Sequence, residues 1–189
     1  MSLRDFEKDE AVKATGIDLE KIHEALEKLA SVEVLVGVPE SEAARQDEAN
    51  ITNAGIGYLA EFGSPANNLP ERPWLMPVIR ENAPVLSGMM VRIARQVIDG
   101  RMSPEAVEKA MHAVGITAVS KIKANIQAGL QPPLSPVTLM HRARRGDEGA
   151  AWEVSWRAAG VNLLDGLLAK PYIDTGNFLA SIKHVVVKK

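Results

Sequence analysis

The sequence predicts an α+β protein, in which a small antiparallel sheet packs against a long helical hairpin and extended loops join the elements. Two long segments, 74–99 and 103–129, show the 3.6-residue apolar period of helices, and the link between them is short enough for a hairpin. Valine recurs at every second position in 31–38, and the valine-rich segment 182–187 closes the chain as a final strand. At 189 residues the chain can bury a sizeable core.

A charged segment and a helix precede the first strand. Asp18 has the side chain of an N-cap. One face of the helix that follows is apolar, with Leu19, Ile22, Leu26 and Leu29. We predict that residues 1–30 form an N-terminal helical arm. Residues 31–189 are predicted to form a single domain, with an insertion at about 141–170.

Between the first strand and the long helices we predict loops and one short helix. Residues 40–50 are polar and lack any period, which indicates an exposed loop. Residues 51–62 have a helical pattern, but Gly55 and Gly57 each lower helix stability by ~1 kcal/mol relative to alanine, so this helix needs tertiary support. The loop after it is restricted by three prolines, Pro65, Pro70 and Pro73.

Both long helices carry end signals. Pro77 fits the first turn of the first helix, Pro84 should kink or divide it, and Gly100 lies where a C-terminal glycine is favoured. Ser103 is predicted to cap the second helix, with Pro104 in its first position. The second helix has one apolar stripe, formed by Val107, Met111, Val114, Ala118, Ile122 and Ile126.

The last third of the chain combines a connector, a basic cluster and a tryptophan pair. Residues 131–136 contain three prolines and predict a stiff connector, and residues 141–146 form a compact basic cluster. Trp152 and Trp156 are four residues apart, which puts both indoles on one helical face. We expect that face to be buried, either in the core or against another subunit.

Composition excludes several classes of protein. Hydrophobic residues make up 46% and charged residues 24%, as in globular domains, and without cysteine the chain has no disulfides or thiolate metal sites. The N-terminus is too charged for a secretory signal, and no apolar run is long enough for a membrane helix, so we expect the protein to stay in the cytoplasm where it is made.

The net charge is −2 but is unevenly spread along the chain. Residues 1–48 carry 13 acidic and 6 basic side chains, a net charge of −7, whereas residues 49–189 carry 11 acidic and 16 basic ones, a net charge of +5. Such a chain can attract neighbouring copies head to side in a ring. Ordinary solvated helix faces produce the same asymmetry more often.

We interpret none of the possible enzyme motifs in the sequence as catalytic. Asp174-Thr175-Gly176 is formally the triplet of aspartic proteases, but only 13 residues follow Gly176, so we interpret it as a turn in which Asp174 caps the next helix. The four histidines, His23, His112, His141 and His184, lack metal-ligand spacing. We therefore expect no catalysis, no metal and no cofactor.

The short motifs between 61 and 75 have a structural interpretation. Gly63, like Gly176, is predicted to need a positive φ or a close backbone approach, and Pro73 to preset the first turn of a helix. Glu61 and Arg72 are near enough in sequence to pair across the loop, which would orient it. Two scarce large aromatic residues, Phe62 and Trp74, are predicted to be core residues more than interface anchors.

Taken in order, these segments resemble a known family. They are Val36-Gly37-Val38-Pro39, Glu61-Phe62-Gly63, Arg72-Pro73-Trp74-Leu75, Pro133-Leu134-Ser135 and Asp174-Thr175-Gly176-Asn177-Phe178-Leu179-Ala180-Ser181-Ile182. The chain is similar, over about residues 31–188, to the virion morphogenesis proteins of Mu-like phages and the related tail-completion (neck) proteins. It departs from them in the Phe178-Leu179 pair and in the long insertion between 141 and 170.

The resemblance implies a structural virion protein that completes the tail or joins head to tail as a subunit of a neck ring. Its implied partners are further copies of itself and the phage tail tube or terminator and head-connector proteins, with genome DNA only in passing and no membrane. It would occur in the host cytoplasm during assembly and in the neck or tail of the virion afterwards. We expect the loops 40–50 and 130–146 to become ordered against neighbouring subunits.

Two alternatives remain open from the sequence. One is a minor tail or assembly-chaperone protein. The other is a weak, non-specific DNA-associated protein, in which Arg142, Arg144 and Arg145 would face phosphates. The slightly negative net charge and the lack of interleaved aromatic residues weigh against a dedicated DNA binder.

Overall fold

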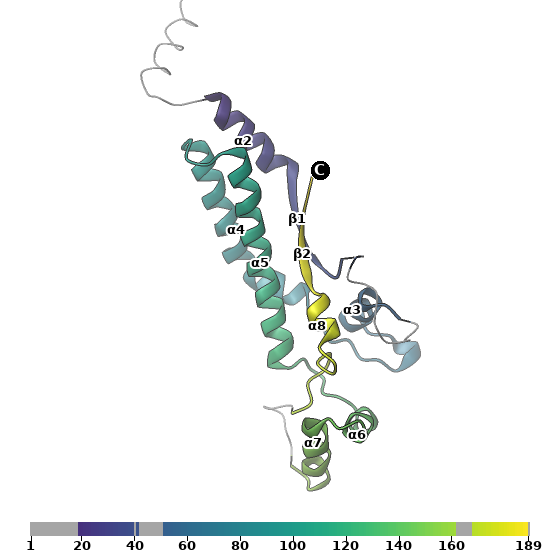
Figure 1. The fold of residues 1–189 in the computed structure, drawn as a ribbon. Coiled ribbons are helices and arrows are strands. Elements are labelled where there is room, and N and C mark those ends of the chain that lie inside the picture. The colour runs from purple at the N-terminus through teal and green to yellow at the C-terminus, as the bar shows by residue number, and fades with distance from the viewer. Residues whose placement is uncertain (1–18, 40, 42–50, 162–167, 189) are drawn as a thin grey trace, which may run out of the picture. The chain divides into compact units, whose positions relative to one another are not determined.

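The computed structural model describes residues 19–39, 41, 51–161 and 168–188, and confirms the α+β class (Figure 1). The described part contains seven α-helices, one 3-10 helix and two strands. In chain order these are α2 (Leu19–Ser31), β1 (Val32–Gly37), α3 (Asn53–Phe62), η2 (Pro65–Asn67), α4 (Met76–Ile98), α5 (Pro104–Ala128), α6 (Pro136–Arg144), α7 (Glu148–Ala158), α8 (Asn177–Ser181) and β2 (Lys183–Lys188).

The strands β1 and β2 pair as a two-stranded antiparallel sheet. They fall where the valine-rich segments predicted them. Among the helices that the structure describes, none has both the length and the apolar character needed to cross a membrane.

The chain divides into two compact units, and α4 and α5 contribute residues to both. The first unit takes residues 1–35, 83–117 and 185–189, and the second takes 36–82 and 118–184. The helix α2 belongs to the first unit, and α3, α6, α7 and α8 belong to the second.

The first unit has its own apolar core, built from α2, both strands, α4 and α5. Its buried members are Ala25, Val32, Ile93, Val97, Val107, Met111 and Val114. Ala25 of α2 is fully buried there, so the helix that we predicted as part of an arm contributes to a core. Residues 1–18, including the predicted cap Asp18, lie outside the described residues.

The end signals of the two long helices are largely confirmed. Gly100 has φ 68° and its N–H donates to the carbonyl of Val97, which ends α4 as predicted. The hydroxyl of Ser103 accepts from the N–H of Ala106 at 3.4 Å and donates to Glu105 at 2.8 Å, and the latter hydrogen bond lowers the pKa of Glu105. The expectation that Pro84 divides the helix is wrong: α4 is continuous through it.

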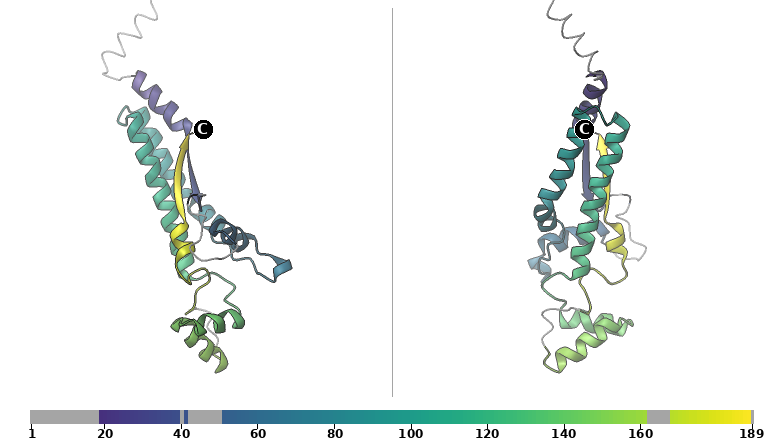
Figure 2. Two further views of the ribbon diagram at one scale, coloured as in Figure 1. Left: turned by 45° about the vertical axis from the view of Figure 1, so that its right-hand side comes forward. Right: turned by 90° about the vertical axis from the view of Figure 1, so that its left-hand side faces the viewer.

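The second unit has two clusters of buried residues. The larger one joins α3, α4, α5 and α8 through Ala60, Trp74, Val78, Ile122, Ile126, Leu130, Phe178 and Ile182. In the smaller one α6 and α7 pack against each other (Figure 2), around Leu134, Leu139, Ala150 and Ala169. Across the two units, all six residues of the apolar stripe predicted for α5 are buried.

Two predictions for the C-terminal half need correction. The expected loop 130–146 contains α6, which begins after Ser135 because the Ser135 hydroxyl accepts from the N–H of Thr138 at 3.2 Å. The tryptophan pair on α7 is not core: Trp152 is 61% and Trp156 42% exposed. Burial of that face against another subunit stays a prediction.

Candidate interaction site

The motif residue Glu61 belongs to α3, and its carboxylate reaches the start of α4 and caps that helix. Its Oε2 accepts from the backbone N–H groups of Trp74 (2.9 Å) and Leu75 (3.0 Å), and its Oε1 accepts from Met76 (3.0 Å). The first N–H groups of a helix have no acceptor within the helix and form its positive end. A carboxylate that is only 8% exposed therefore satisfies the first N–H of α4 and the two backbone N–H groups that lead into it.

Arg72 does not pair with Glu61, so that prediction is wrong. Its Nε donates to the carbonyl of Pro132 (2.6 Å) and its Nη2 to that of Pro133 (2.9 Å). The planar guanidinium is suited to two acceptors side by side. Arg72 thereby ties the loop before α4, residues 63–75 and here called the entry loop, to the proline-rich connector.

The entry loop turns at Gly63, where the prediction is confirmed. Gly63 has φ 68°, and a Cβ on it would lie 2.8 Å from the N of Glu71 and 2.9 Å from the O of Leu69. No side chain fits so close to backbone atoms. Pro73, in contrast, is not in the first turn of the helix: α4 starts at Met76, and Pro73 lies in the non-helical approach to it.

We expect Gly63→Ala to lower the free energy of unfolding by about 2–4 kcal/mol, because it adds both backbone strain and a backbone clash. Gly88→Ala is the matched control. Gly88 is inside α4, and its Cβ would meet nothing within 4 Å. That change should raise stability by about 0.5–1 kcal/mol. Urea unfolding measures both, and equal effects at the two positions would contradict the close approach at Gly63.

Trp74 connects the entry loop with the C-terminal segment 174–182. It is 3% exposed, as predicted for a core residue, and its Nε1 donates to the carbonyl of Gly57 at 2.8 Å. Its ring meets Phe178 edge to face, with centroids 5.2 Å apart. The entry loop and the C-terminal motif therefore form one packed structure.

The other predicted core aromatic, Phe62, is 59% exposed, which corrects that prediction. On α3 it lies beside Tyr58, which is 65% exposed, with ring centroids 4.9 Å apart. The buried face of α3 carries small or polar residues, Asn53, Gly57, Ala60 and Glu61. Two large rings are thus left on the outer face of a helix whose end is fixed by Glu61.

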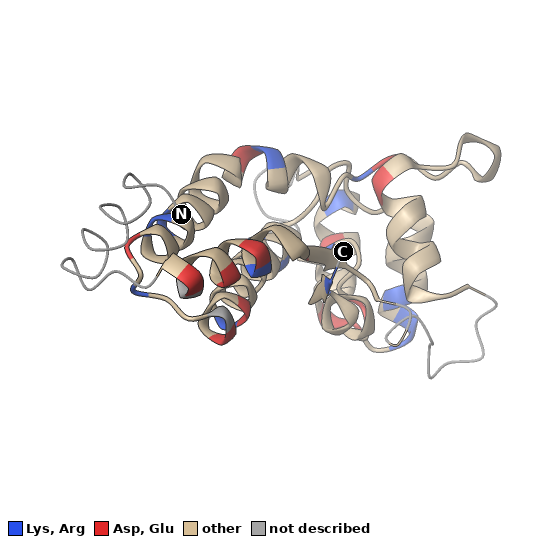
Figure 3. Ribbon diagram, turned by 90° about the horizontal axis from the view of Figure 1, so that it is seen from above, with Lys and Arg blue, Asp and Glu red and all other residues tan. Residues whose placement is uncertain are grey.

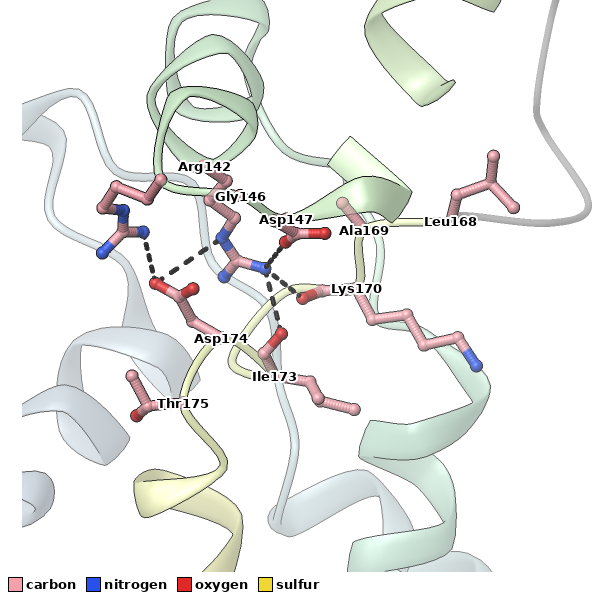
Figure 4. Close-up of a pocket in the computed structure, with 10 residues that line it drawn as sticks. Arg142, Gly146, Asp147, Leu168, Ala169, Lys170, Ile173, Asp174 and Thr175 are labelled. Carbon is pink, nitrogen blue, oxygen red and sulfur yellow. Dashed lines mark hydrogen bonds and ion pairs between the residues drawn. The ribbon is translucent and has the colours of Figure 1, made fainter. Parts of the chain in front are cut away.

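A second network surrounds Arg142, which is 6% exposed (Figure 4). Its Nη1 donates to the carbonyls of Lys170 and Ile173, both at 3.0 Å. Asp147 and Asp174 lie at 4.0 and 3.9 Å from the guanidinium. Arg142 therefore holds the segment before α8 against α6, and it does not face outward as the DNA alternative requires.

The remaining residues of the C-terminal motif and the basic cluster are now placed. Asp174 does not cap α8: its Oδ2 accepts from Arg145 at 2.6 Å, and the cap position is Gly176, with φ 79° as predicted for a positive-φ glycine. The hydroxyl of Thr175 accepts from the N–H of Asn177 at 3.4 Å. Of the three predicted DNA-facing arginines, Arg142 is buried and Arg145 is paired, whereas Arg144 is exposed.

The Arg142 network lines an open pocket of about 540 Å³. Arg142 and Arg145 in its lining pair with Asp147 and Asp174, and Figure 3 shows acidic and basic residues interspersed along the ribbon. Within the described ranges, no three acidic or histidine side chains come together as a metal site would require. The chemistry of the pocket is that of a structural ion network.

One buried network was missed by sequence reasoning. Glu153 of α7 is fully buried, pairs with Arg157, and accepts from the N–H groups of Leu168 (3.1 Å) and Ala169 (2.9 Å). Arg157 also donates to the carbonyl of Leu134 at 2.9 Å. The four-residue spacing of Glu153 and Arg157 was the available signal, but surface helices show the same spacing.

No family model, no curated protein and no solved structure matches this chain. The resemblance to phage proteins therefore depends on the motif residues alone. The geometry adds their structural role: Glu61, Arg72 and Trp74 bind backbone groups, and Gly63 and Gly176 adopt positive φ angles.

Proposed function

We propose that this chain is a structural, non-enzymatic virion protein that completes the phage tail or joins head to tail as a subunit of a neck ring. The observation that carries the proposal is the outer face of α3. Tyr58 and Phe62 are exposed there, on a helix held in place from behind by Trp74 and Glu61. A rigidly supported aromatic surface is typical of a protein that gains stability by docking.

The motif geometry agrees with this role. Glu61, Arg72 and Arg142 each bind backbone groups, which positions the loops that carry them. The same contacts reduce the support for the DNA alternative, because two of its three arginines are occupied. Detection in purified virions would separate a neck protein from an assembly chaperone that leaves the particle.

The direct test is to assemble phage without this protein. Separate heads and tails in electron micrographs are the expected result. Normal infectious particles would refute the proposal. Whole particles of reduced number would instead favour the chaperone alternative.

The exposed aromatic pair supplies a sharper prediction. In the complementation of such particles, Tyr58→Asp/Phe62→Asp should reduce joining at least about tenfold, because charges would have to be buried at the contact. Thermal unfolding should stay close to that of the original chain, since both rings are exposed. Glu71→Ala, an exposed change in the neighbouring loop, is the control and should complement fully. Full complementation by the double variant would show that this face is not a contact.

A further inference from the structure

The outer surface of α2 is acidic and carries exposed leucines. Glu20, Glu24 and Glu27 are exposed, and so are Leu19 (55%) and Leu26 (37%). The opposite face of the helix is occupied by the core residue Ala25. Glu27 lies 3.2 Å from the Nε2 of His23 on the same helix. Lys28 is bound elsewhere: its Nζ lies 2.8 Å from Glu108 of α5, a contact that also lowers the pKa of Glu108.

The outer surface of α4 in the same unit has the opposite character. Its exposed large residues are Val85 (50%), Met90 (44%), Val91 (49%) and Ile98 (58%). Arg92 and Arg95 of the same helix are also exposed, and α4 contains no acidic residue after Asn82. Val91, Arg95 and Ile98 follow one another at four- and three-residue spacing, which places them on a single face.

The two surfaces are opposite in charge and similar in apolar content and length. At a rise of 1.5 Å per residue, α2 is about 20 Å long and the stretch of α4 from residue 83 to 98 about 24 Å. Each carries exposed apolar side chains beside charges of one sign. Two different patches of one chain can pair reciprocally in a two-fold dimer, or head to tail between successive copies, and the head-to-tail arrangement closes into rings or continues as filaments.

We infer that the acidic outer face of α2 docks on the basic, apolar outer face of α4 of a second copy of this chain. This contact rests on the ring of the proposed function and assigns the surfaces that would form it. The occupant is a further copy because the same chain supplies both complementary halves. The sequence-wide charge difference, −7 for residues 1–48 and +5 for residues 49–189, has the same direction.

Charge exchange tests this contact. One variant is Arg92→Glu/Arg95→Glu, and the other is Glu24→Arg/Glu27→Arg. Each presents like charges on both faces, so its self-association should be at least about tenfold weaker than that of the original chain. An equimolar mixture of the two variants, and a single chain carrying all four changes, should regain association. Sedimentation velocity over a concentration series, at low and high salt, measures each case.

A matched control makes the same change in charge elsewhere. Lys121→Glu/Lys183→Glu alters two exposed lysines outside both faces and should associate as the original chain does. Association of the α4 variant as strong as that of this control, or no recovery in the four-change chain, would overturn the α2–α4 contact. The contact would also be overturned if the original chain stayed monomeric at every concentration, or if α4 bound only a different protein. None of these results decides whether the protein joins heads to tails, which the micrographs of particles without it test. The proposed function and the α2–α4 contact can therefore fail independently.

Discussion

Replacing Glu61 with alanine is expected to lower the free energy of unfolding by roughly 3–5 kcal/mol, since each unsatisfied donor costs about 1–3 kcal/mol. The carboxylate of Glu61 accepts from three backbone N–H groups at the start of α4, at 2.9 to 3.0 Å. Without it these donors have no acceptor, and the positive end of the helix loses its counter-charge. Urea unfolding followed by circular dichroism measures the change.

Two variants keep this prediction sharp. Glu61→Gln retains one acceptor oxygen, so its loss should lie between that of the alanine variant and zero, and it provides a measurement where the alanine variant fails to fold. Glu71→Ala removes an exposed carboxylate of the same loop and should change stability by less than about 0.5 kcal/mol. If Glu61→Ala lowered the free energy of unfolding no more than Glu71→Ala, the cap would not contribute to stability.

The helix α5 was predictable because its signals are local. Ser103, Pro104 and a six-residue stripe all lie within the segment that they define, and a 3.6-residue period leaves one choice of buried face. The strands were predictable for the same reason. The continuity of α4 through Pro84 was not predictable. Proline lacks the backbone N–H of a helical hydrogen bond, and the residues around it decide whether the helix tolerates that loss.

The partners of the buried charges could not be read from the sequence. Pairing Glu61 with Arg72 assumed that opposite charges find each other, but backbone groups are the more numerous partners. Glu61 reaches N–H groups 13 to 15 residues away, and Arg72 reaches carbonyls 60 and 61 residues away. No period or spacing marks such contacts. The turn of the entry loop back onto α3 creates the contacts of Glu61, and folding of the connector onto the entry loop creates those of Arg72.

The burial of α3 shows why average hydrophobicity misleads in a tightly packed helix. Phe62 would be the obvious core residue, but Gly57 and Ala60 are buried instead, because the ring of Trp74 lies against this face. A Cβ on Gly57 would already be 3.1 Å from that ring. Small residues thus mark the core side, and the large rings are left outside.

The contact between Trp74 and Phe178 should therefore carry a large share of stability in the second unit. Trp74→Ala is expected to cost about 3–5 kcal/mol, from the lost ring and the orphaned carbonyl of Gly57. Phe62→Ala, which removes an exposed ring of the same region, should cost less than about 1 kcal/mol. Chemical unfolding of the two variants gives this comparison directly.

A double-mutant cycle then tests whether the two motif segments are coupled. With Trp74→Leu and Phe178→Leu as milder changes, the edge-to-face contact predicts a coupling of about 0.5–1.5 kcal/mol. The same cycle with Phe62→Leu in place of Trp74→Leu should give no coupling, since Phe62 is on the exposed face. Strictly additive effects of Trp74 and Phe178 would mean that this contact does not couple the entry loop to the C-terminal motif. The contact between Trp74 and Phe178 would then not explain why the two motifs occur together in this chain.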